Sequence, residues 1–251
     1  MTQKVALVTG SARGIGLATT AKFLEDGWKV VRVDWDAPAL EASAQGLGDV
    51  HDIVADISLE ADVDSLVHAV QDITGGGLNA LVNNAGIADF GPMHETDFAR
   101  WRRIMSINLD GTFLMSQAFI PFLKARKGAI VNIASISALR ASTLRVAYGT
   151  SKAAVAHLTE QQAAELGEFG VRANCVAPGP VRTKLAMAVH TPEIIAAYHD
   201  AIPLNRYGQE EELAEAICWL CSDKASYVNG QTLAVDGGFE STGIGLPALR
   251  G

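Results

Sequence analysis

Short apolar runs alternate along the chain with longer segments in which apolar residues recur at helical spacing. Lys4–Thr9 is rich in β-branched residues, and Leu17–Asp26 repeats apolar residues three or four positions apart until Gly27 ends the pattern. Further strands are predicted at 28–34, 52–55, 79–83, 129–134, 172–177 and 231–235, and further helices at 37–45, 61–74, 98–109, 112–126, 147–169 and 211–221. Strands that alternate with crossover helices run parallel. The pattern therefore predicts an α/β fold, a doubly wound (Rossmann-like) parallel sheet of about seven strands flanked by helices.

No linker, charge block or internal repeat divides this pattern, so we expect one domain over residues 1–251. The one long segment expected to be irregular lies between Pro178 and Arg206, and a loop of that length is often functional. Hydrophobic residues make up 49% of the chain and charged residues 19%, which is enough apolar material for a buried core.

Charge and residue usage exclude several classes of function. Lys plus Arg number 20 and Asp plus Glu 28, and the resulting net charge of −8 disfavours nucleic-acid or membrane-surface binding. No apolar run reaches the ~18 residues that span a bilayer, and no signal peptide is evident, so a cytoplasmic location is expected. The histidine spacing predicts no metal site, and Cys218 and Cys221 are expected to pack in the core of an amphipathic helix.

A glycine-rich turn links the first predicted strand to the first predicted helix. Gly10, Gly14 and Gly16 would allow a tight turn and let the backbone approach a pyrophosphate at the helix N-terminus. Three glycines also suit an ordinary strand–helix turn, so the glycines alone do not show that the turn binds a dinucleotide. Asp34 ends the second strand, where the ribose hydroxyls of a dinucleotide would lie.

The spacing of these glycines after Thr9 resembles that of the short-chain dehydrogenase/reductase family. The resemblance extends over nearly the whole chain, because each further family motif follows the appropriate strand. These motifs are Asp56, Asn83–Gly86, Asn108 within Ser106–Leu109, Ser135, the Tyr148–Lys152 segment and the Pro178–Thr183 loop.

The resemblance implies a catalytic set of Asn108, Ser135, Tyr148 and Lys152, with Tyr148 as the proton donor and acceptor. Tyr148 and Lys152 are four residues apart and share a helix face. Lowering a phenol pKa from ~10 to ~7 takes roughly 4 kcal/mol, which one ammonium ~4 Å away supplies at an effective dielectric of ~20. Ser135 is expected to polarise a carbonyl, with Ser137 as its competitor or a neighbour lining the substrate side. Asn108 would kink its helix and hold a water linking Lys152 to solvent, although a mid-helix Asn also suits a surface position.

The same resemblance implies the residues that would contact the dinucleotide. They are Gly10, Arg13, Gly14, Ile15, Gly16, Asp34, Trp35, Asp56, Ile57, Asn84, Ala85, Gly86, Tyr148, Lys152, Pro178, Gly179, Val181 and Thr183. Substrate contacts are expected from Ser135, Ser137 and Tyr148.

The choice of cofactor is a question of charge at the adenosine ribose. Asp34 would accept hydrogen bonds from both ribose hydroxyls and repel a 2′-phosphate. Arg13 and Arg32 argue the other way, because a basic residue near this position suits NADP. We weigh Asp34 more heavily and predict NAD.

The function expected is an oxidoreductase that interconverts a secondary alcohol (a polyol, a sugar or a small or apolar alcohol) and its ketone. A 3-oxoacyl-thioester reductase is the alternative enzyme, which Asp34 disfavours because that reaction usually takes NADPH. A non-catalytic dinucleotide-binding regulator is the alternative of another class, and it would have no use for Tyr148. The resemblance implies that residues 184–206 form a substrate lid. Its apolar side chains suit a substrate with an apolar or small neutral body, or they simply pack the lid itself. The tail 239–251 is expected to dock on another subunit of a homotetramer.

Overall fold

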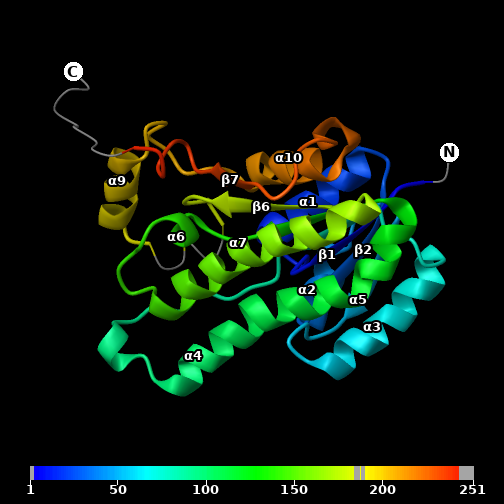
Figure 1. Ribbon diagram of the computed structural model, residues 1–251. Coiled ribbons are helices and arrows are strands. Elements are labelled where there is room, and N and C mark those ends of the chain that lie inside the picture. The colour runs from blue at the N-terminus through cyan, green and yellow to red at the C-terminus, as the bar shows by residue number, and fades with distance from the viewer. Residues whose placement is uncertain (1–2, 184–186, 188–189, 243–251) are drawn as a thin grey trace.

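The fold is built on seven parallel strands in a single sheet (Figure 1), seen here in a computed structural model that describes residues 3–183, 187 and 190–242. The order across the sheet is β3-β2-β1-β4-β5-β6-β7. The strands are β1 (Val5–Thr9), β2 (Lys29–Asp34), β3 (Val50–Val54), β4 (Ala80–Asn83), β5 (Ala129–Ile133), β6 (Arg172–Pro178) and β7 (Thr232–Val235). The chain adds strands outward from β1 in one direction and then, from β4, in the other. This is the doubly wound arrangement that the sequence predicts.

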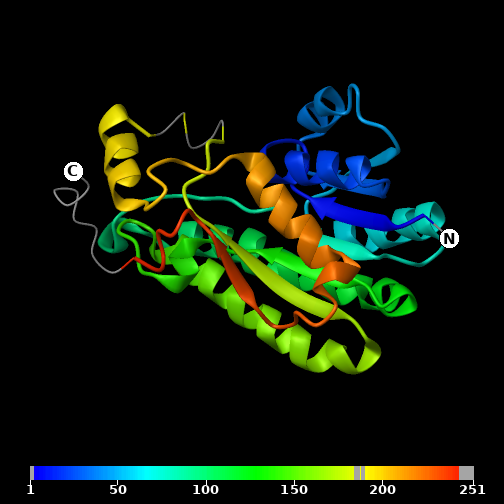
Figure 2. The same cartoon turned by 90° about the horizontal axis from the view of Figure 1, so that it is seen from above.

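Helices cover both faces of this sheet. The helices of the chain include α1 (Gly14–Glu25), α2 (Ala37–Ser43), α3 (Glu60–Thr74), α4 (Phe98–Met105), α5 (Gly111–Arg126), α6 (Ile136–Leu139), α7 (Val146–Leu166), α9 (Pro192–Ala201) and α10 (Glu210–Cys221). Figures 1 and 2 show α1 and α10 together on one face and α3, α5 and α7 on the other. Short 3-10 turns lie at Met93–Glu95, Gly167–Phe169 and Asp223–Ala225. None of the helices within the described ranges is long and apolar enough to cross a membrane.

The two faces of β1 belong to two separate hydrophobic clusters. Leu7 packs in the cluster that contains Phe119 of α5, whereas Ala6 and Val8 pack in the cluster that contains Phe23 of α1. All three of these β1 side chains are fully buried. A strand that is covered on both faces must be apolar at every position, which explains the continuous apolar runs in the sequence.

The cysteines of α10 lie in the second of these clusters. Cys218 and Cys221 are buried among the side chains that α10 packs against the sheet, and both are free thiols. Burial raises the pKa of the Cys221 thiol to about 12. These two residues therefore fill the core, as the sequence indicates.

Two segments differ from the elements that the sequence predicts. A π-helical turn, Ser106–Asp110, joins α4 directly to α5, where two separate helices are expected. The stretch between Pro178 and Arg206 contains α9, so the expectation that it is wholly irregular is wrong. Thr191 caps α9, its side chain accepting a hydrogen bond from the Ile194 N–H, and Pro192 occupies the first turn, a common helix start.

Candidate active site

The predicted functional residues gather at the carboxyl ends of β1, β2, β4, β5 and β6. The winding of the sheet changes direction between β1 and β4. Loops diverge at such a point and leave a crevice in which open α/β sheets bind their ligands. Figure 2 shows this edge, with β6 and β7 running toward it and α9 beyond their ends.

The glycine-rich turn after β1 is packed so closely that side chains are excluded from it. Gly10 has a φ of +62°, and a Cβ on Gly16 would overlap the Gly10 carbonyl oxygen and lie 2.6 Å from Asn84 Nδ2. Asn84 Nδ2 donates to the carbonyl oxygens of Thr9 (3.0 Å) and Gly10 (2.9 Å). The loop after β4 thus fixes the shape of the turn.

The N-terminus of α1 follows the glycine-rich turn. The side chain of its N-cap residue, Arg13, makes no capping hydrogen bond, and the first turn of the helix contains no acidic residue. Gly14 has a φ of +60°, and a Cβ there would meet only Glu210 Oε1 at 3.8 Å. Unpaired N–H groups at a helix start bind phosphate groups, so Gly14, Ile15 and Gly16 fit the pyrophosphate of a dinucleotide.

Asp34 ends β2 beside this turn and is held in one orientation. Its carboxylate accepts hydrogen bonds from the N–H groups of Ala12 (3.0 Å) and Asp36 (3.1 Å). The side chain is nearly buried, whereas Trp35 beside it is 71% exposed. A fixed carboxylate at this position can accept hydrogen bonds from ribose hydroxyls.

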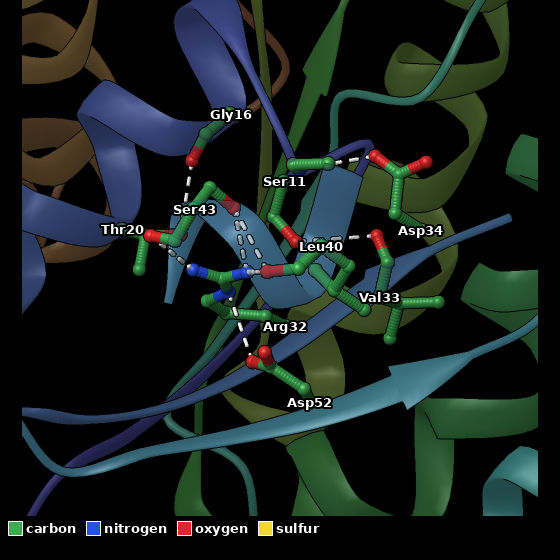
Figure 3. A network of polar contacts seen from close by, with 10 residues as sticks. Ser11, Gly16, Thr20, Arg32, Val33, Asp34, Leu40, Ser43 and Asp52 are labelled. Atoms are coloured by element: carbon green, nitrogen blue, oxygen red, sulfur yellow. Dashed lines mark hydrogen bonds and ion pairs between the residues drawn. The ribbon is translucent and has the colours of Figure 1, made fainter. Parts of the chain in front are cut away.

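Arg13 and Arg32, the two arginines whose charge would favour NADP, both contact other groups of the protein. Arg13 forms an ion pair with Asp36, and its guanidinium holds the pKa of that carboxyl well below its usual range. Arg32 is fully buried, and Figure 3 shows its guanidinium among Leu40, Ser43 and Asp52. It donates to the Leu40 carbonyl (2.6 Å) and to Ser43 Oγ (2.9 Å), and its Nε lies 3.0 Å from Asp52 Oδ1.

Asp36 is a residue beside the predicted cofactor site that the sequence analysis did not single out. Its own side chain also accepts the Ala39 N–H (3.2 Å), which makes it the N-cap of α2. The residues Asp36–Pro38 carry that capping signal, but nothing in the sequence indicates that the same carboxylate pairs with Arg13.

Asp56, Ile57 and the Asn84–Gly86 loop border the same edge. Asp56 Oδ1 accepts from the Ser58 N–H (2.9 Å) and hydroxyl (2.7 Å), and Ile57 is buried. The Ala85 N–H donates to Thr9 Oγ1 at 3.0 Å. A Cβ on Gly86 would lie 3.1 Å from Asn108 Oδ1 and 3.2 Å from Lys152 Nζ. Gly86 therefore lies where the predicted cofactor and catalytic residues meet.

Ser135 and Tyr148 come together from the end of β5 and from α7. The Ser135 hydroxyl hydrogen-bonds the Tyr148 phenol, and its oxygen also accepts the Ser137 N–H at 3.1 Å. Burial raises the pKa of Tyr148, while the Ser135 hydrogen bond and the charge of Arg145 oppose that rise. Ser135 and Ser137 are equally buried, so burial does not distinguish their roles.

Lys152 points to the backbone of β5 instead of the phenol. Its Nζ donates to the Ile133 carbonyl at 2.7 Å and lies 6.0 Å from the centroid of the Tyr148 ring. Burial lowers the pKa of Lys152 to about 8. The Lys152 ammonium is therefore farther from the Tyr148 ring than the ~4 Å used in the sequence-based argument.

Asn108 is completely buried in the π-helical turn and ties two elements of the site together. Its Oδ1 accepts the Ile87 N–H (2.8 Å), and its Nδ2 donates to the Ile87 carbonyl (3.0 Å) and to Ser151 Oγ (3.0 Å). The side chain therefore links the loop after β4 to α7. π-Helical turns are frequent at functional sites.

The Pro178–Thr183 loop leaves β6 beside β7. A Cβ on Gly179 would lie 2.6 Å from Asp236 Cβ, so the loop needs glycine there. Val181 is buried and bridges to Gly208. The predicted lid, 184–206, continues from Thr183, but residues 184–186, 188 and 189 lie outside the described ranges, as do residues 243–251 of the predicted tail.

No cluster of His, Cys, Asp or Glu among the described residues could hold a metal ion. The side chains at this edge that can take part in acid–base chemistry include the buried Ser135 and Lys152 and the half-buried Tyr148.

The chain is similar over nearly its whole length to proteins of one known family. The family model described as Enoyl-(Acyl carrier protein) reductase matches residues 10–240. The chain is 39% identical over 245 residues to 2-(S)-hydroxypropyl-CoM dehydrogenase 3 of Xanthobacter autotrophicus, covering 94% of this chain and 96% of that protein. It is 40% identical over 241 residues to galactitol 2-dehydrogenase (L-tagatose-forming) of Cereibacter sphaeroides, covering 93% and 94%.

A solved structure supports the same relationship. The crystal structure of levodione reductase matches with a TM-score of 0.91 at 31% identity, covering 97% of this chain and 100% of that chain. Enzymes of this kind are oxidoreductases that act on CH–OH groups with a nicotinamide dinucleotide. The chain belongs to the short-chain dehydrogenase/reductase family.

Proposed function

We propose that this protein is an NAD-dependent dehydrogenase that interconverts a secondary alcohol and its ketone. The observation that carries the choice of NAD is the arrangement of charge beside β2. Asp34 faces the position of the ribose, and the nearest basic candidates are neutralised or buried. The secondary alcohol is supported by the relatives, which are named for a 2-hydroxypropyl group and for position 2 of galactitol.

The residues that would hold the dinucleotide form a continuous path along the carboxyl edge of the sheet. The turn at Gly10–Gly16 would receive the pyrophosphate, and Asp34 the adenosine ribose. Asp56 and Ile57 would flank the adenine, and Asn84–Gly86, Lys152 and the Pro178–Thr183 loop would surround the nicotinamide side. When bound, the dinucleotide donates or accepts the hydride.

The chain's own residues would supply the proton and orient the reacting oxygen. In the direction of reduction, Ser135 donates a hydrogen bond to the carbonyl oxygen, and Tyr148 transfers its phenolic proton to that oxygen. In oxidation, the tyrosinate removes the alcohol proton. Lys152 must move from the Ile133 carbonyl toward the bound ribose and the phenol, where its charge would stabilise the tyrosinate.

NADP is disfavoured because its 2′-phosphate would meet a buried carboxylate, and the two guanidinium groups named above are paired with other residues. Asp34 is nearly buried, so its repulsion of a phosphate is poorly screened by solvent. Arg13 could contact that phosphate only after leaving Asp36. Arg32 could do so only after leaving Leu40, Ser43 and Asp52.

Absorbance of the reduced nicotinamide across a panel of secondary alcohols and ketones tests this function. We expect turnover with NAD that the Tyr148→Phe variant loses while its affinity for NAD is kept. Tight NAD binding with no turnover on any member of the panel would contradict the proposal and favour the non-catalytic regulator.

We also propose that the protein assembles as a homotetramer, with residues 184–206 as a lid over the substrate and the 239–251 tail against a neighbouring subunit. Exposed aromatic side chains on α4 and α5 support an assembly, because Phe98 is 75% exposed and Phe113 is 46% exposed. Light scattering on a size-exclusion column tests this, and a monomeric mass would contradict it.

A further inference from the structure

Arg145 lies beside the reactive phenol, among aromatic side chains. It is the residue before α7 and comes three positions ahead of Tyr148. The centre of its guanidinium is 4.3 Å from the Phe90 ring centroid and 5.8 Å from the Tyr148 ring centroid. Its Nη2 donates to the Tyr198 hydroxyl at 3.4 Å, which is long for such a bond.

This guanidinium has no carboxylate partner within residues 3–183, 187 and 190–242. The residues outside those ranges include no Asp or Glu. The acidic residue next to Phe90, Asp89, is held by Arg100, whose Nε donates to Asp89 Oδ2 at 2.8 Å. A partly buried cation without a countercharge is costly, and a bound anion would relieve that cost.

The contacts of Arg145 place it on the substrate side of Tyr148. Phe90 belongs to the loop after β4, and Tyr198 belongs to α9. The Phe90 ring packs edge-on against the Tyr148 ring, with centroids 6.2 Å apart. The backbone before Arg145 is fixed, since the Gly91 N–H donates to the Leu144 carbonyl at 2.9 Å. The guanidinium is therefore held beside the position that a substrate bound to Tyr148 would occupy.

We propose that Arg145 binds an anionic group of the substrate, so that the preferred alcohol or ketone carries a carboxylate, sulfonate or phosphate. This rests on the proposed function for the reacting end, where Ser135 and Tyr148 hold the oxygen. The Arg145 guanidinium, with the Tyr198 hydroxyl beside it, holds the charged end. The substrate is thus an organic anion, in place of the apolar or small neutral molecule that the apolar lid sequence suggests.

Binding of a non-reacting anion tests the site without turnover. 1-Butanesulfonate is titrated by calorimetry into the protein saturated with NAD, using wild type, Arg145→Met, Arg145→Gln and Arg145→Lys. We expect Arg145→Met and Arg145→Gln to bind 1-butanesulfonate at least about tenfold more weakly than wild type does. The affinity of Arg145→Lys is expected to lie between that of wild type and that of the uncharged variants. Arg102→Met, which removes an exposed guanidinium of α4 paired with Asp110, is the matched control and is expected to bind as wild type does.

The result that overturns the proposal is equal binding of 1-butanesulfonate by wild type, Arg145→Met and Arg145→Gln, or no binding by wild type. The affinity for NAD and the melting temperature of each variant show whether the fold is intact. Two uncharged variants, Arg145→Met and Arg145→Gln, are used so that the binding of 1-butanesulfonate can still be measured in one of them if the other misfolds.

A substrate series separates failure of this site from failure of the proposed function. The ketones 3-oxobutanoate, 4-oxopentanoate and 5-oxohexanoate are compared with their methyl esters, with NADH as reductant. We expect wild type to prefer at least one acid over its ester by about tenfold or more in kcat/KM, and Arg145→Met to lose that preference. Equal rates for acids and esters in wild type would overturn the anion site and leave the dehydrogenase intact. Arg145-dependent binding of 1-butanesulfonate with no turnover of any ketone would support the site and contradict the proposed function.

Discussion

Arg13 and Asp36 form an ion pair beside the glycine-rich turn, and Asp36 follows Asp34 by two residues. In the NAD-dependent enzyme that we propose, Asp34 would bind the ribose hydroxyls, whereas Asp36 would hold the Arg13 guanidinium of the glycine-rich turn. Selectivity for NAD would then be divided between one group that repels a phosphate and another that pairs with the residue able to attract it.

Replacing Asp34 with Ala is expected to relax the choice of cofactor. The variant loses the acceptor for the ribose hydroxyls and the repulsion of a 2′-phosphate. We expect the ratio of kcat/KM for NADP to that for NAD to rise about tenfold or more, measured by initial rates with each cofactor. An unchanged ratio would show that Asp34 does not face the ribose.

Replacing Asp36 with Asn is expected to raise activity with NADP while leaving activity with NAD nearly unchanged. Asn keeps the N-cap of α2, but the neutral side chain no longer holds the Arg13 guanidinium. The KM for NADP is expected to fall by about threefold to tenfold, because Arg13 becomes available to the phosphate. Asp97→Asn, which removes the charge of the N-cap of α4, is the matched control. If Asp36→Asn and Asp97→Asn have the same KM for NADP, Asp36 has no role in cofactor selectivity.

Ser135 and Ser137 can be distinguished by single substitutions. Ser135→Ala removes the hydroxyl that hydrogen-bonds Tyr148 and is expected to lower kcat by about 10²–10³, as loss of an oxyanion donor does. Ser137→Ala is expected to change kcat by less than about tenfold, since only its backbone N–H contacts Ser135. Steady-state kinetics check both, and the reverse order of effects would show that Ser137 polarises the carbonyl.

Lys152→Met is expected to abolish turnover and to stabilise the protein near neutral pH. Burial lowers the pKa of Lys152 to about 8 in the folded state, below the ordinary value of 10.5 that applies when the chain is unfolded. The folded state therefore binds its proton less tightly, and wild-type stability rises as pH increases from 8 to 10.5.

The variant has no such group, so its stability advantage over wild type should shrink by about 3 kcal/mol across that pH window. Urea unfolding of both proteins at pH 7.5 and pH 10 measures this difference. If the difference in free energy of unfolding between the two proteins is the same at both pH values, the Lys152 ammonium is not destabilised by burial.

The places of the candidate catalytic and cofactor residues were predictable where these residues follow a strand end or share a helix face. Asp34, Ser135 and the Tyr148–Lys152 pair have sequence positions that fix them at the carboxyl edge of a parallel sheet. The helix α9 could also have been predicted, because the Thr191–Pro192 pair carries its start signal.

Other features depend on which distant side chains meet in the fold. Arg32 has the position of a possible phosphate ligand, but α2 folds over it and its guanidinium turns to Leu40, Ser43 and Asp52. Among the described residues Arg145 has no ion pair, and the neighbouring carboxylate, Asp89, is held by Arg100 from α4. The position of Lys152 depends on the Ile133 carbonyl, a backbone atom for which the sequence carries no signal.

The most direct test is to measure kcat/KM of the wild-type protein with NAD and with NADP on a secondary alcohol that it oxidises. The panel includes 2-butanol, 2,3-butanediol, galactitol and 3-hydroxybutanoate, and the absorbance of the reduced nicotinamide is followed. We predict turnover with a preference for NAD of about tenfold or more, reflecting the buried Asp34 carboxylate and the Arg13–Asp36 pair. A kcat/KM with NADP that equals or exceeds the kcat/KM with NAD would contradict the proposed preference for NAD.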